Sequence, residues 1–419
     1  MNIQKFSAAI LCLAALMACE SPPAPEVVEV EEEKLILLLQ AEAFENSSAL
    51  EVVKGEGTVR LDSGQWLEFS LNVPISGRYA LRVYGESEGG GQLWVEDYVY
   101  NNDGRTYNIT GHLNFPDQGV RSSQGVDGSP LADTLHPIRL HASKGSVWVD
   151  QIELELLKVH QPTPEILTQT MQGNNWELVW SDEFDGSAVD QSKWTYDLGD
   201  WGWGNHELQY YTEGREENAR LEEGRLVIEA RKNDNGHEWT SARLTTRGKV
   251  AFRYGRIELR AKVPGGKGCW AAGWTLGDAY VDELSWPYCG EIDILESVGF
   301  ETDPVTDSGQ AHATVHTPAY YFKIGNQITG ITDVPDITTA WHTYAVDWYP
   351  DSIVGTVDGR RYYLYDKTAD EREWPFHQPQ NLILNLAMGG GWGGAMGMDT
   401  TLVSQRFELD YIRVYQKTH

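Results

Sequence analysis

Three carboxylic acids lie within six residues of an otherwise apolar run, the segment CGEIDILESVG at 289–299. Alternate side chains of a β-strand share one face, so Glu291 and Asp293 point the same way, opposite the intervening isoleucines. Regular alternation would then turn Glu296 toward the apolar side, where burial of its charge is costly. One extra residue at a β-bulge, which we assign to Leu295, returns it to the face of the other acids.

Three acids on one face suit either a hard metal ion or acid/base chemistry on a glycosidic bond. Calcium sites usually draw on Gly-containing loops, whereas these acids alternate with Ile and Leu. Glycoside hydrolysis pairs a carboxylate with a protonated carboxyl, and a separation of about 5 to 5.5 Å gives retention. Glu291 and Glu296 can lean together across a curved sheet, while Asp293 between them helps to hold one carboxyl protonated. We therefore favour the glycosidic chemistry over the metal.

Composition and charge narrow the classes of partner. The chain has 419 residues with 42 Gly and 16 Trp, which is a globular, turn-rich composition with room for more than one domain. Its formal net charge of −29 disfavours binding to nucleic acid or anionic lipid surfaces, which need clustered Lys and Arg. We expect a monomer with no nucleic-acid partner.

The amino terminus has the pattern of an export signal. Residues 1–19 combine a Lys with a short apolar stretch, and the sequence LMAC that ends at Cys19 resembles a bacterial lipobox. We expect Cys19 to be lipidated and to anchor the chain in the cell envelope, at the outer membrane, facing the periplasm or the exterior. The alternative is a plain signal peptide that contains a Cys. Residues 20–34 are Pro-rich and then acidic, as a solvated tether requires.

Alternating apolar and polar runs recur along the rest of the chain. Residues 35–157 carry one such series and residues 175–419 a second, separated by a Pro-, Thr- and Gln-rich linker at 158–174. The pattern predicts an all-β fold of two β-sandwich domains. Thirteen of the sixteen Trp fall in the second series, which favours an aromatic-lined carbohydrate groove there.

Two cysteines remain after the export signal, Cys269 and Cys289. In an oxidising compartment they are a candidate disulfide, and the alternative is two buried thiols. Their spacing fits no zinc site. The sequence leaves this choice open.

The second series resembles glycoside hydrolase family 16, and within it the laminarinase-like endo-β-1,3-glucanases. The motifs that carry the resemblance include WSDEFDG, WGNHELQYYT, TSARLTTRGK, YGRIELRAKVPGGKGCW, WPYCGEIDILESVG, HATVHT and NLILNLAMGGGWGG. The resemblance implies a concanavalin-like jelly roll with a concave cleft, in which Glu291 is the nucleophile, Glu296 the acid/base and Asp293 the residue that tunes them. Family members specific for mixed-linkage glucan tend to lack the extra residue at Leu295. No cofactor is implied for catalysis.

Further positions that match the family are implied to contact the sugar or to hold a structural Ca²⁺. The implied sugar contacts are Asn205, Arg260, Trp270, Trp274, Trp286, His316 and Trp392, with His316 near the acid/base. Glu183 and Asp410 match positions where relatives hold Ca²⁺ on the convex face. Ser297 and Ala271 stand where relatives often have His and Pro, and these departures affect specificity more than catalysis.

The first series looks like a family 6 type carbohydrate-binding module. The resemblance rests on QAEAF, SGQWLEFSLNVPISGRYALRVYG and SVWVDQIELE, and it implies a structural Ca²⁺ at Glu42 and Asp150. The final strand has Trp148 where such modules often carry an Asn ligand. A spacer between lipid and enzyme is the alternative to a sugar-binding module.

The leading hypothesis is therefore an anchored, retaining endo-hydrolase of β-1,3-glucans. The alternatives are hydrolysis of mixed-linkage β-1,3-1,4-glucan or an algal galactan, transglycosylation, and glucan recognition without catalysis. Non-catalytic proteins of this fold typically lose the catalytic acids, whereas this chain keeps all three.

Overall fold

The computed structural model describes residues 34–49, 52–100 and 105–419. Every regular element in these ranges is a β-strand or a single turn of 3₁₀ helix, so the predicted all-β fold class is confirmed. Among these residues, no helix is long and apolar enough to span a membrane. The predicted signal peptide with Cys19, and the tether before Lys34, lie outside the described residues.

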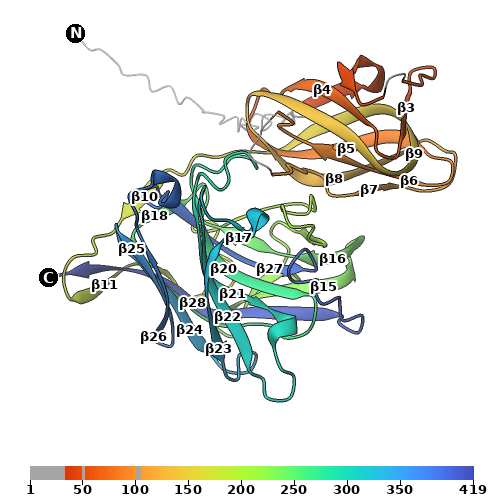
Figure 1. Ribbon diagram of the computed structural model, residues 1–419. Coiled ribbons are helices and arrows are strands. Elements are labelled where there is room, and N and C mark those ends of the chain that lie inside the picture. Colours follow the sequence, from red (N-terminus) through yellow and green to blue (C-terminus); the bar gives the residue numbers. More distant parts are fainter. Residues whose placement is uncertain (1–33, 50–51, 101–104) are drawn as a thin grey trace, which may run out of the picture. The chain divides into compact units, whose positions relative to one another are not determined.

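The amino-terminal sandwich, residues 35–159, consists of two sheets that share one long strand (Figure 1). Its elements are β1 (Ile36–Gln40), η1 (Ala41–Ala43), β2 (Asn46–Ser47), β3 (Val59–Asp62), β4 (Trp66–Asn72), β5 (Gly77–Glu86), β6 (Gly91–Glu96), β7 (Leu113–Phe115), β8 (Ser122–Leu131) and β9 (Leu135–Val159). The first half of β9 pairs with β4 and β6, and its second half pairs with β1, β3 and β5.

The change of sheet along β9 falls at Gly145. This residue has φ +64°, and a Cβ there would lie 2.1 Å from the carbonyl oxygen of Gly90, so only glycine fits. Alternate residues such as Phe69, Leu81 and Ile138 are at most 2% exposed and fill the space between the sheets. The alternating runs of the sequence therefore become strands with one buried face.

The carboxy-terminal sandwich contains the remaining elements. They are β10 (Glu165–Thr168), β11 (Asn175–Asp182), β12 (Thr195–Tyr196), β13 (Gln209–Tyr211), β14 (Ala219–Glu222), β15 (Arg225–Asp234), β16 (His237–Ser241), β17 (Arg243–Thr245), β18 (Val250–Arg253), β19 (Gly255–Lys262), β20 (Cys269–Gly277), β21 (Glu291–Val298), η2 (Gly299–Glu301), β22 (Gly309–His316), η3 (Phe322–Ile324), β23 (Ile328–Val334), β24 (His342–Trp348), β25 (Ser352–Val357), β26 (Arg360–Asp366), η4 (Glu371–Glu373), β27 (Gln380–Met388) and β28 (Ser404–Thr418). Strand β10 lies within the predicted linker and pairs with β18, so part of that linker is a sheet edge.

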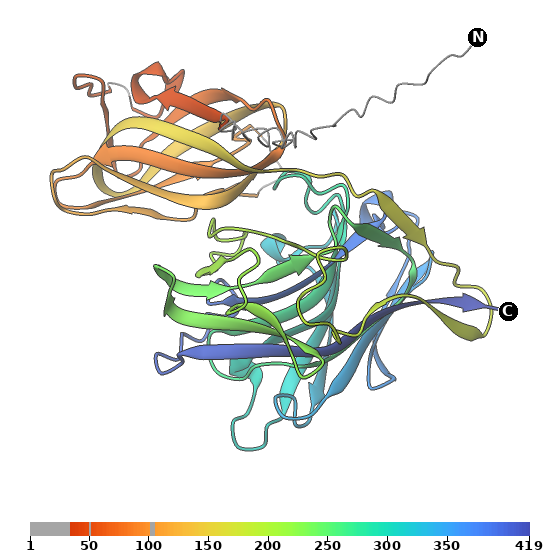
Figure 2. The same ribbon diagram turned by 180° about the vertical axis from the view of Figure 1, so that it is seen from behind.

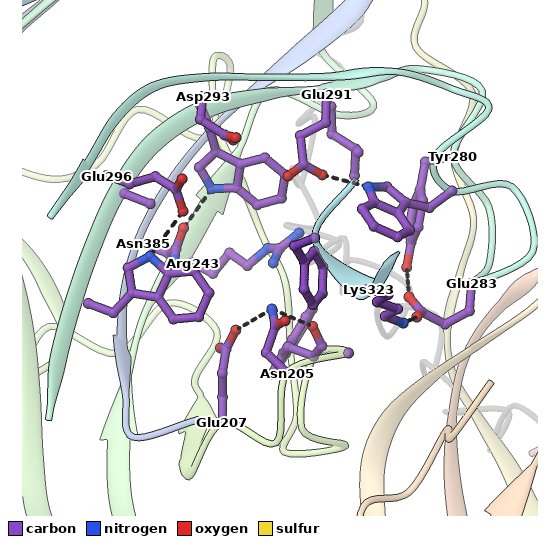
Figure 3. A pocket seen from close by; sticks show the side chains of 18 of the residues that line it. Asn205, Glu207, Arg243, Tyr280, Glu283, Glu291, Asp293, Glu296, Lys323 and Asn385 are labelled. Carbon is purple, nitrogen blue, oxygen red and sulfur yellow. Dashed lines mark hydrogen bonds and ion pairs between the residues drawn. The ribbon is translucent and has the colours of Figure 1, made fainter. Parts of the chain in front are cut away.

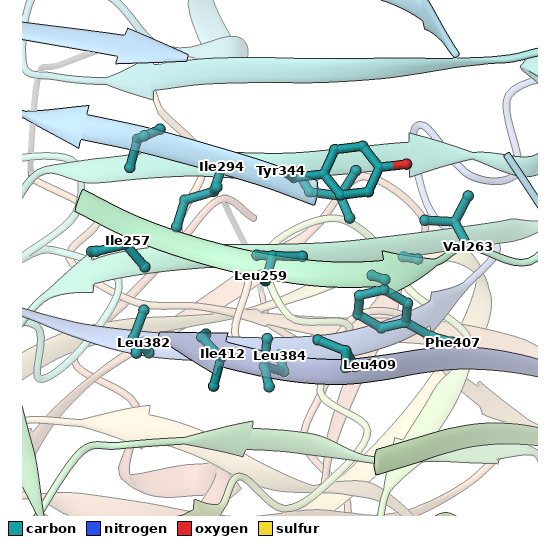
Figure 4. Close-up of a cluster of buried hydrophobic side chains, with 14 of the residues drawn as sticks. Ile257, Leu259, Val263, Ile294, Tyr344, Leu382, Leu384, Phe407, Leu409 and Ile412 are labelled. Atoms are coloured by element: carbon teal, nitrogen blue, oxygen red, sulfur yellow. The ribbon is translucent and has the colours of Figure 1, made fainter. Parts of the chain in front are cut away.

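Two stacked sheets form this sandwich, as Figure 2 shows from behind. We call the sheet with the order β10-β18-β27-β20-β21-β22-β23 the cleft sheet, and the sheet with the order β13-β16-β15-β28-β19-β24-β25-β26 the outer sheet. Apolar side chains from both sheets meet in one core; Figure 4 shows Leu259 of β19, Ile294 of β21, Leu384 of β27 and Phe407 of β28 among them.

Both cysteines after the export signal are buried free thiols. Cys269 begins β20, whereas the carbonyl oxygen of Cys289 lies against Gly277 at the other end of that strand. Nine residues of strand span roughly 26 Å, far beyond the reach of a disulfide. The structure therefore supports the thiol alternative.

Candidate active site

The three acids lie on β21, whose pairing shifts register between Asp293 and Glu296. Opposite β22, the two residues Ile294 and Leu295 face the single residue Ala313, and both are at most 1% exposed. Glu296 thereby returns to the face of the other two acids, which confirms the predicted bulge. On the β20 side, the residue left unpaired is Ile294, whereas we expected Leu295.

The neighbouring strand β20 makes room for the bulge. Gly273 pairs with Leu295 on the core side, and a Cβ at Gly273 would lie 2.8 Å from the Cδ2 of Leu259. The residues that alternate with this glycine face the pocket instead, and they are Trp270, Ala272, Trp274 and Leu276. The pattern CWAAGWTLG thus supplies an aromatic wall on one face and space for two crowded side chains on the other.

Glu291, Asp293 and Glu296 line an open pocket on the cleft sheet (Figure 3). The indole N–H of Trp286 donates to Glu291 Oε2 at 2.8 Å, and that of Trp270 donates to Glu296 Oε1 at 3.1 Å. Glu291 and Glu296 are therefore each held by one tryptophan.

Burial and mutual repulsion shift the proton affinities of these acids. Burial raises the pKa of Glu291 to about 7, and burial together with the charge of Glu291 raises the pKa of Glu296 to about 8. Burial and its two acidic neighbours raise the pKa of Asp293 well above its usual range. Because the charge of Glu291 acts on Glu296, the site favours one ionised carboxylate beside a protonated carboxyl, as acid/base chemistry on a glycosidic bond requires.

His316 lies beside Glu291 and Asp293. Its Nε2 is 3.6 Å from Glu291 Oε1 and 3.4 Å from Asp293 Oδ2, and burial lowers its pKa to about 3, so the ring is neutral. The expected position near Glu296 is therefore wrong. The histidine opposite Glu296 is His312, which binds Glu301 Oε2 through Nε2 at 2.7 Å.

Five other predicted sugar contacts lie at this site. Asn205, Trp270, Trp274 and Trp286 line the pocket, and the Trp392 ring packs edge-on against Trp270 at a centroid distance of 5.4 Å. Trp274 donates its indole N–H to Asn385 Oδ1 at 2.7 Å, so its ring orientation is fixed.

The prediction for Arg260 is wrong. It lies on β19 of the outer sheet, where Ile257, Leu259 and Ala261 face the core, so the Arg260 side chain points away from the core and from the cleft sheet. There it forms an ion pair with Asp410. The family resemblance implied a sugar contact at Arg260, whereas the structure places the residue on the other sheet.

The sequence analysis missed several pocket residues. These are Trp201, Trp203, Glu207, Arg243, Tyr280, Glu283, Phe322, Lys323 and Asn385. Arg243 lies 4.8 Å from the ring centroids of both Trp203 and Trp274, and its Nε donates to Asp197 Oδ2 at 2.9 Å. A signal for Arg243 was available in the sequence. The motif TSARLTTRGK, which contains it, is polar and charged where a core strand should be apolar. Glu283 lies in a turn and Lys323 in the single helical turn η3, and strand alternation predicts the position of neither.

Three of the four acids predicted to bind structural Ca²⁺ form ion pairs with arginines. Arg413 donates to both oxygens of Glu183, at 2.6 and 3.0 Å, and Asp150 pairs with Arg121 at 2.5 Å. Glu42 is exposed. Among the described residues, the one set of three or more possible metal ligands is Glu291, Asp293 and His316, with ligand atoms within 4.8 Å of one another. Paired-carboxyl chemistry needs no metal.

An all-β sandwich whose cleft sheet presents two carboxyl groups of different pKa among tryptophans defines a glycoside hydrolase. The model of glycosyl hydrolases family 16 matches residues 202–413. The chain belongs to that family.

Three relatives each match a little over half of this chain. A beta-glucanase of Rhodothermus marinus is 50% identical over 251 residues, which cover 58% of this chain and 86% of the relative. The X-ray structure of the laminarinase from Rhodothermus marinus matches with a TM-score of 0.54 and 48% identity, over 58% of this chain and 99% of that chain. A mutant of SCLam, a non-specific endo-β-1,3(4)-glucanase co-crystallised with an oligosaccharide, matches with a TM-score of 0.54 and 41% identity, over 59% of this chain and 98% of that chain.

Proposed function

We propose that this chain is a retaining endo-hydrolase of β-1,3-glucan of the laminarin type. The observation that carries the proposal is the bulge in β21, which places Glu291 and Glu296 on one face of the cleft sheet with raised and different pKa values. The relatives named above, a laminarinase, a beta-glucanase and an endo-β-1,3(4)-glucanase, support this substrate class.

The arrangement suits a double displacement. The ionised carboxylate of Glu291 attacks the anomeric carbon while protonated Glu296 gives its proton to the departing glycosidic oxygen. A glycosyl ester forms on Glu291, and Glu296, now a carboxylate, takes a proton from the water that hydrolyses this ester. Asp293 stays protonated between them and limits the negative charge that the buried site must hold.

The direct test is product release from laminarin by the purified chain and by two isosteric variants. Native protein should release oligosaccharides of the β-anomer first, as retention requires; Glu291→Gln should abolish turnover of laminarin, and Glu296→Gln should lower it by about a hundredfold or more. Turnover that survives both substitutions would contradict the proposed roles.

Mixed-linkage β-1,3-1,4-glucan is a second candidate substrate, because one matching structure is of a non-specific endo-β-1,3(4)-glucanase. Parallel digests of laminarin and of cereal β-glucan, with products sized by chromatography, separate the two. A higher kcat/KM on the cereal glucan would transfer the assignment to the mixed-linkage polymer.

We further propose that the chain is a lipid-anchored envelope protein, held through Cys19 at the outer membrane, and acts as a monomer. The support is the lipobox-like sequence and the Pro-rich acidic stretch after it. Labelling with a fatty-acid analogue in a Gram-negative host should mark the native chain and spare Cys19→Ser. Equal labelling of both chains would exclude this anchor.

The arginine pairs at Glu183, Asp410 and Asp150 give no support to structural Ca²⁺.

A further inference from the structure

The segment that follows β9 is held against the carboxy-terminal sandwich. Lys158, near the end of β9, donates to the carbonyl oxygen of Tyr196 at 2.9 Å and to Glu213 Oε1 at 2.8 Å. Thr163 Oγ1 accepts the backbone N–H of Gly248 at 3.2 Å. A pocket lies where residues 158–161 meet β12 and the turn between β17 and β18. It shares no lining residue with the pocket of the three acids.

Basic side chains outnumber acidic ones around this second pocket, although the whole chain has a formal net charge of −29. The basic residues that line it are Arg78, Lys158, Arg247 and Lys249. The one carboxylate among its described lining residues is Asp197, which already accepts a hydrogen bond from Arg243 Nε at 2.9 Å. Lys158 is paired with Glu213, whereas Lys249 acts on the carboxylate of Asp190 without forming an ion pair with it. Much of the positive charge in the pocket is therefore not compensated.

Two guanidinium groups in this pocket lack acceptors. Arg247 Nη1 donates to the carbonyl oxygens of Asp278 and Tyr280 at 3.3 and 2.7 Å, whereas its Nη2 is buried with no hydrogen-bond partner among the described residues. Nη1 of Arg78 is also buried without such a partner, and its Nη2 is 3.9 Å from Asp197 Oδ1. Buried donors are nearly always paired in folded proteins, so the two arginines indicate a missing acceptor.

A neighbouring histidine is affected by the same positive charge. Burial, together with the charges of Arg247 and Arg78, lowers the pKa of His160 to about 4. The carboxylates of Asp278 and Asp133 act in the opposite sense and more weakly. His160 is therefore neutral at neutral pH, and an anion entering the pocket meets a positive local field.

We propose that this pocket binds a tetrahedral oxyanion, phosphate or sulfate. The basic groups come from β5, from the segment after β9 and from the turn after β17, and a tetrahedral ion presents acceptor oxygens in all of these directions. Its oxygens accept charge-assisted hydrogen bonds from Arg78 and Arg247 and compensate the charge of Lys249. The bound ion joins the segment after β9 to the carboxy-terminal sandwich. The same chemistry is offered by the free ion and by an ester group on a sugar.

Binding is measured by isothermal titration calorimetry on the full chain. The probes are sodium phosphate and sodium sulfate, with sodium chloride at equal ionic strength as the reference. Native protein should bind phosphate or sulfate saturably and should show no saturable binding of chloride. Lys249→Gln should weaken binding about tenfold, because a charge-assisted contact is lost. The matched control is Lys144→Gln, which removes the same charge from an exposed position on the amino-terminal sandwich and should leave the affinity unchanged.

Thermal melting separates a binding defect from a folding defect. Arg247→Gln should abolish binding, but it also removes the hydrogen bonds to Asp278 and Tyr280 and should lower the melting temperature. Lys249→Gln should melt like native protein in chloride and should lose most of the rise that phosphate gives native protein.

Two outcomes would overturn the proposal: no saturable binding of either oxyanion by native protein, or equal affinity in Lys249→Gln and Lys144→Gln. Glucose 6-sulfate separates the two sources of the ligand. Tighter binding of glucose 6-sulfate than of inorganic sulfate would support the site and assign it to a sugar ester, and weaker binding would support the site and assign it to the free ion.

Discussion

Acidic side chains in the carboxy-terminal sandwich occur in two settings that differ in their cations. On the outer sheet, each of several acids meets an arginine: Arg413 holds Glu183 in a two-point ion pair, and Arg256 pairs with Asp347 at 2.8 Å. On the cleft sheet, the three acids of β21 have no arginine or lysine partner among the described residues. The guanidinium in their pocket, Arg243, is paired with Asp197 instead.

The two settings have opposite effects on protonation. The hydrogen bonds from Arg413 lower the pKa of Glu183, whereas burial, which outweighs the more distant charges of Arg243 and Lys323, raises the pKa of Glu291 and Glu296 toward neutrality. A paired acid keeps its charge and contributes to stability, while an unpaired buried acid can exchange a proton at working pH. The distribution of arginines therefore separates structural acids from catalytic ones.

The largest expected effect comes from removing the proton donor. Glu296→Gln should lower kcat on laminarin by about 10²- to 10⁴-fold, because the departing sugar then leaves without protonation. An activated aryl β-laminaribioside, whose leaving group needs little protonation, should retain a much larger share of its first-step rate. Burst kinetics of aryl release measures that step, and an equal loss on both substrates would argue against Glu296 as the acid.

The pH dependence of kcat/KM tests the order of ionisation. Glu291 must be ionised and Glu296 protonated, so activity should peak between about pH 7 and pH 8. It should fall by up to about tenfold per unit below the lower value, as Glu291 gains a proton, and above the upper value, as Glu296 loses one. Initial rates on dilute laminarin across pH 4 to 10 provide the profile. A flat optimum near pH 4.5 would mean that these acids titrate like exposed ones.

Removing an acid from the cleft should also stabilise the fold. The folded state of native protein holds the Glu296 proton up to about pH 8, whereas an unfolded Glu releases it near its ordinary pKa of 4.5. Native stability therefore falls as pH rises through this window, and Glu296→Gln removes that loss. We expect a gain of at least about 1 kcal/mol at pH 8 and no gain near pH 4, because one unit of pKa corresponds to about 1.4 kcal/mol. Denaturant unfolding at both pH values measures it, and equal stability at pH 8 would contradict the argument.

A Glu-to-Gln substitution on the outer sheet should lower the stability of the fold, by a smaller amount. Glu183→Gln removes the partner of Arg413 and should cost about 0.2–1 kcal/mol, because the pair is partly exposed to solvent. The lowered pKa of Glu183 means that its contribution is present above pH 4.5 and is lost as pH falls. Thermal melting in low and in 1 M salt checks this, since screening should erase the difference. A higher melting temperature for Glu183→Gln would contradict the distinction between acids on the two sheets.

Local patterns in the sequence were sufficient for the fold class and for the placement of three acids on one face. The alternation around Glu291 and Glu296 is a property of adjacent residues, and so is the extra residue that forms the bulge. The sugar contact predicted at Arg260 came from the family resemblance, and a matched motif does not state which of the two sheets carries the residue. The position of His316 was also mispredicted. His312 and His316 both face the cleft, and only the cross-strand register decides which acid each one meets.

Residues that long-range contacts bring into the pocket could not be predicted from the sequence. Arg243 enters the pocket through the pairing of β17 with β27, and Lys323 through a loop that meets Glu283 at 3.4 Å. Neither contact follows from a periodic pattern. The arginine partners of Glu183 and Asp410 also required the structure, because each pair joins strands or loops at least 150 residues apart.

The pairing of β1 with β9 brings the two ends of the amino-terminal sandwich together. Ile36 pairs with Glu155, only four residues before β9 ends at Val159, so the chain enters and leaves the sandwich at the same end. Domains with neighbouring ends tolerate insertion into and removal from a longer chain, because the path of the flanking segments changes little.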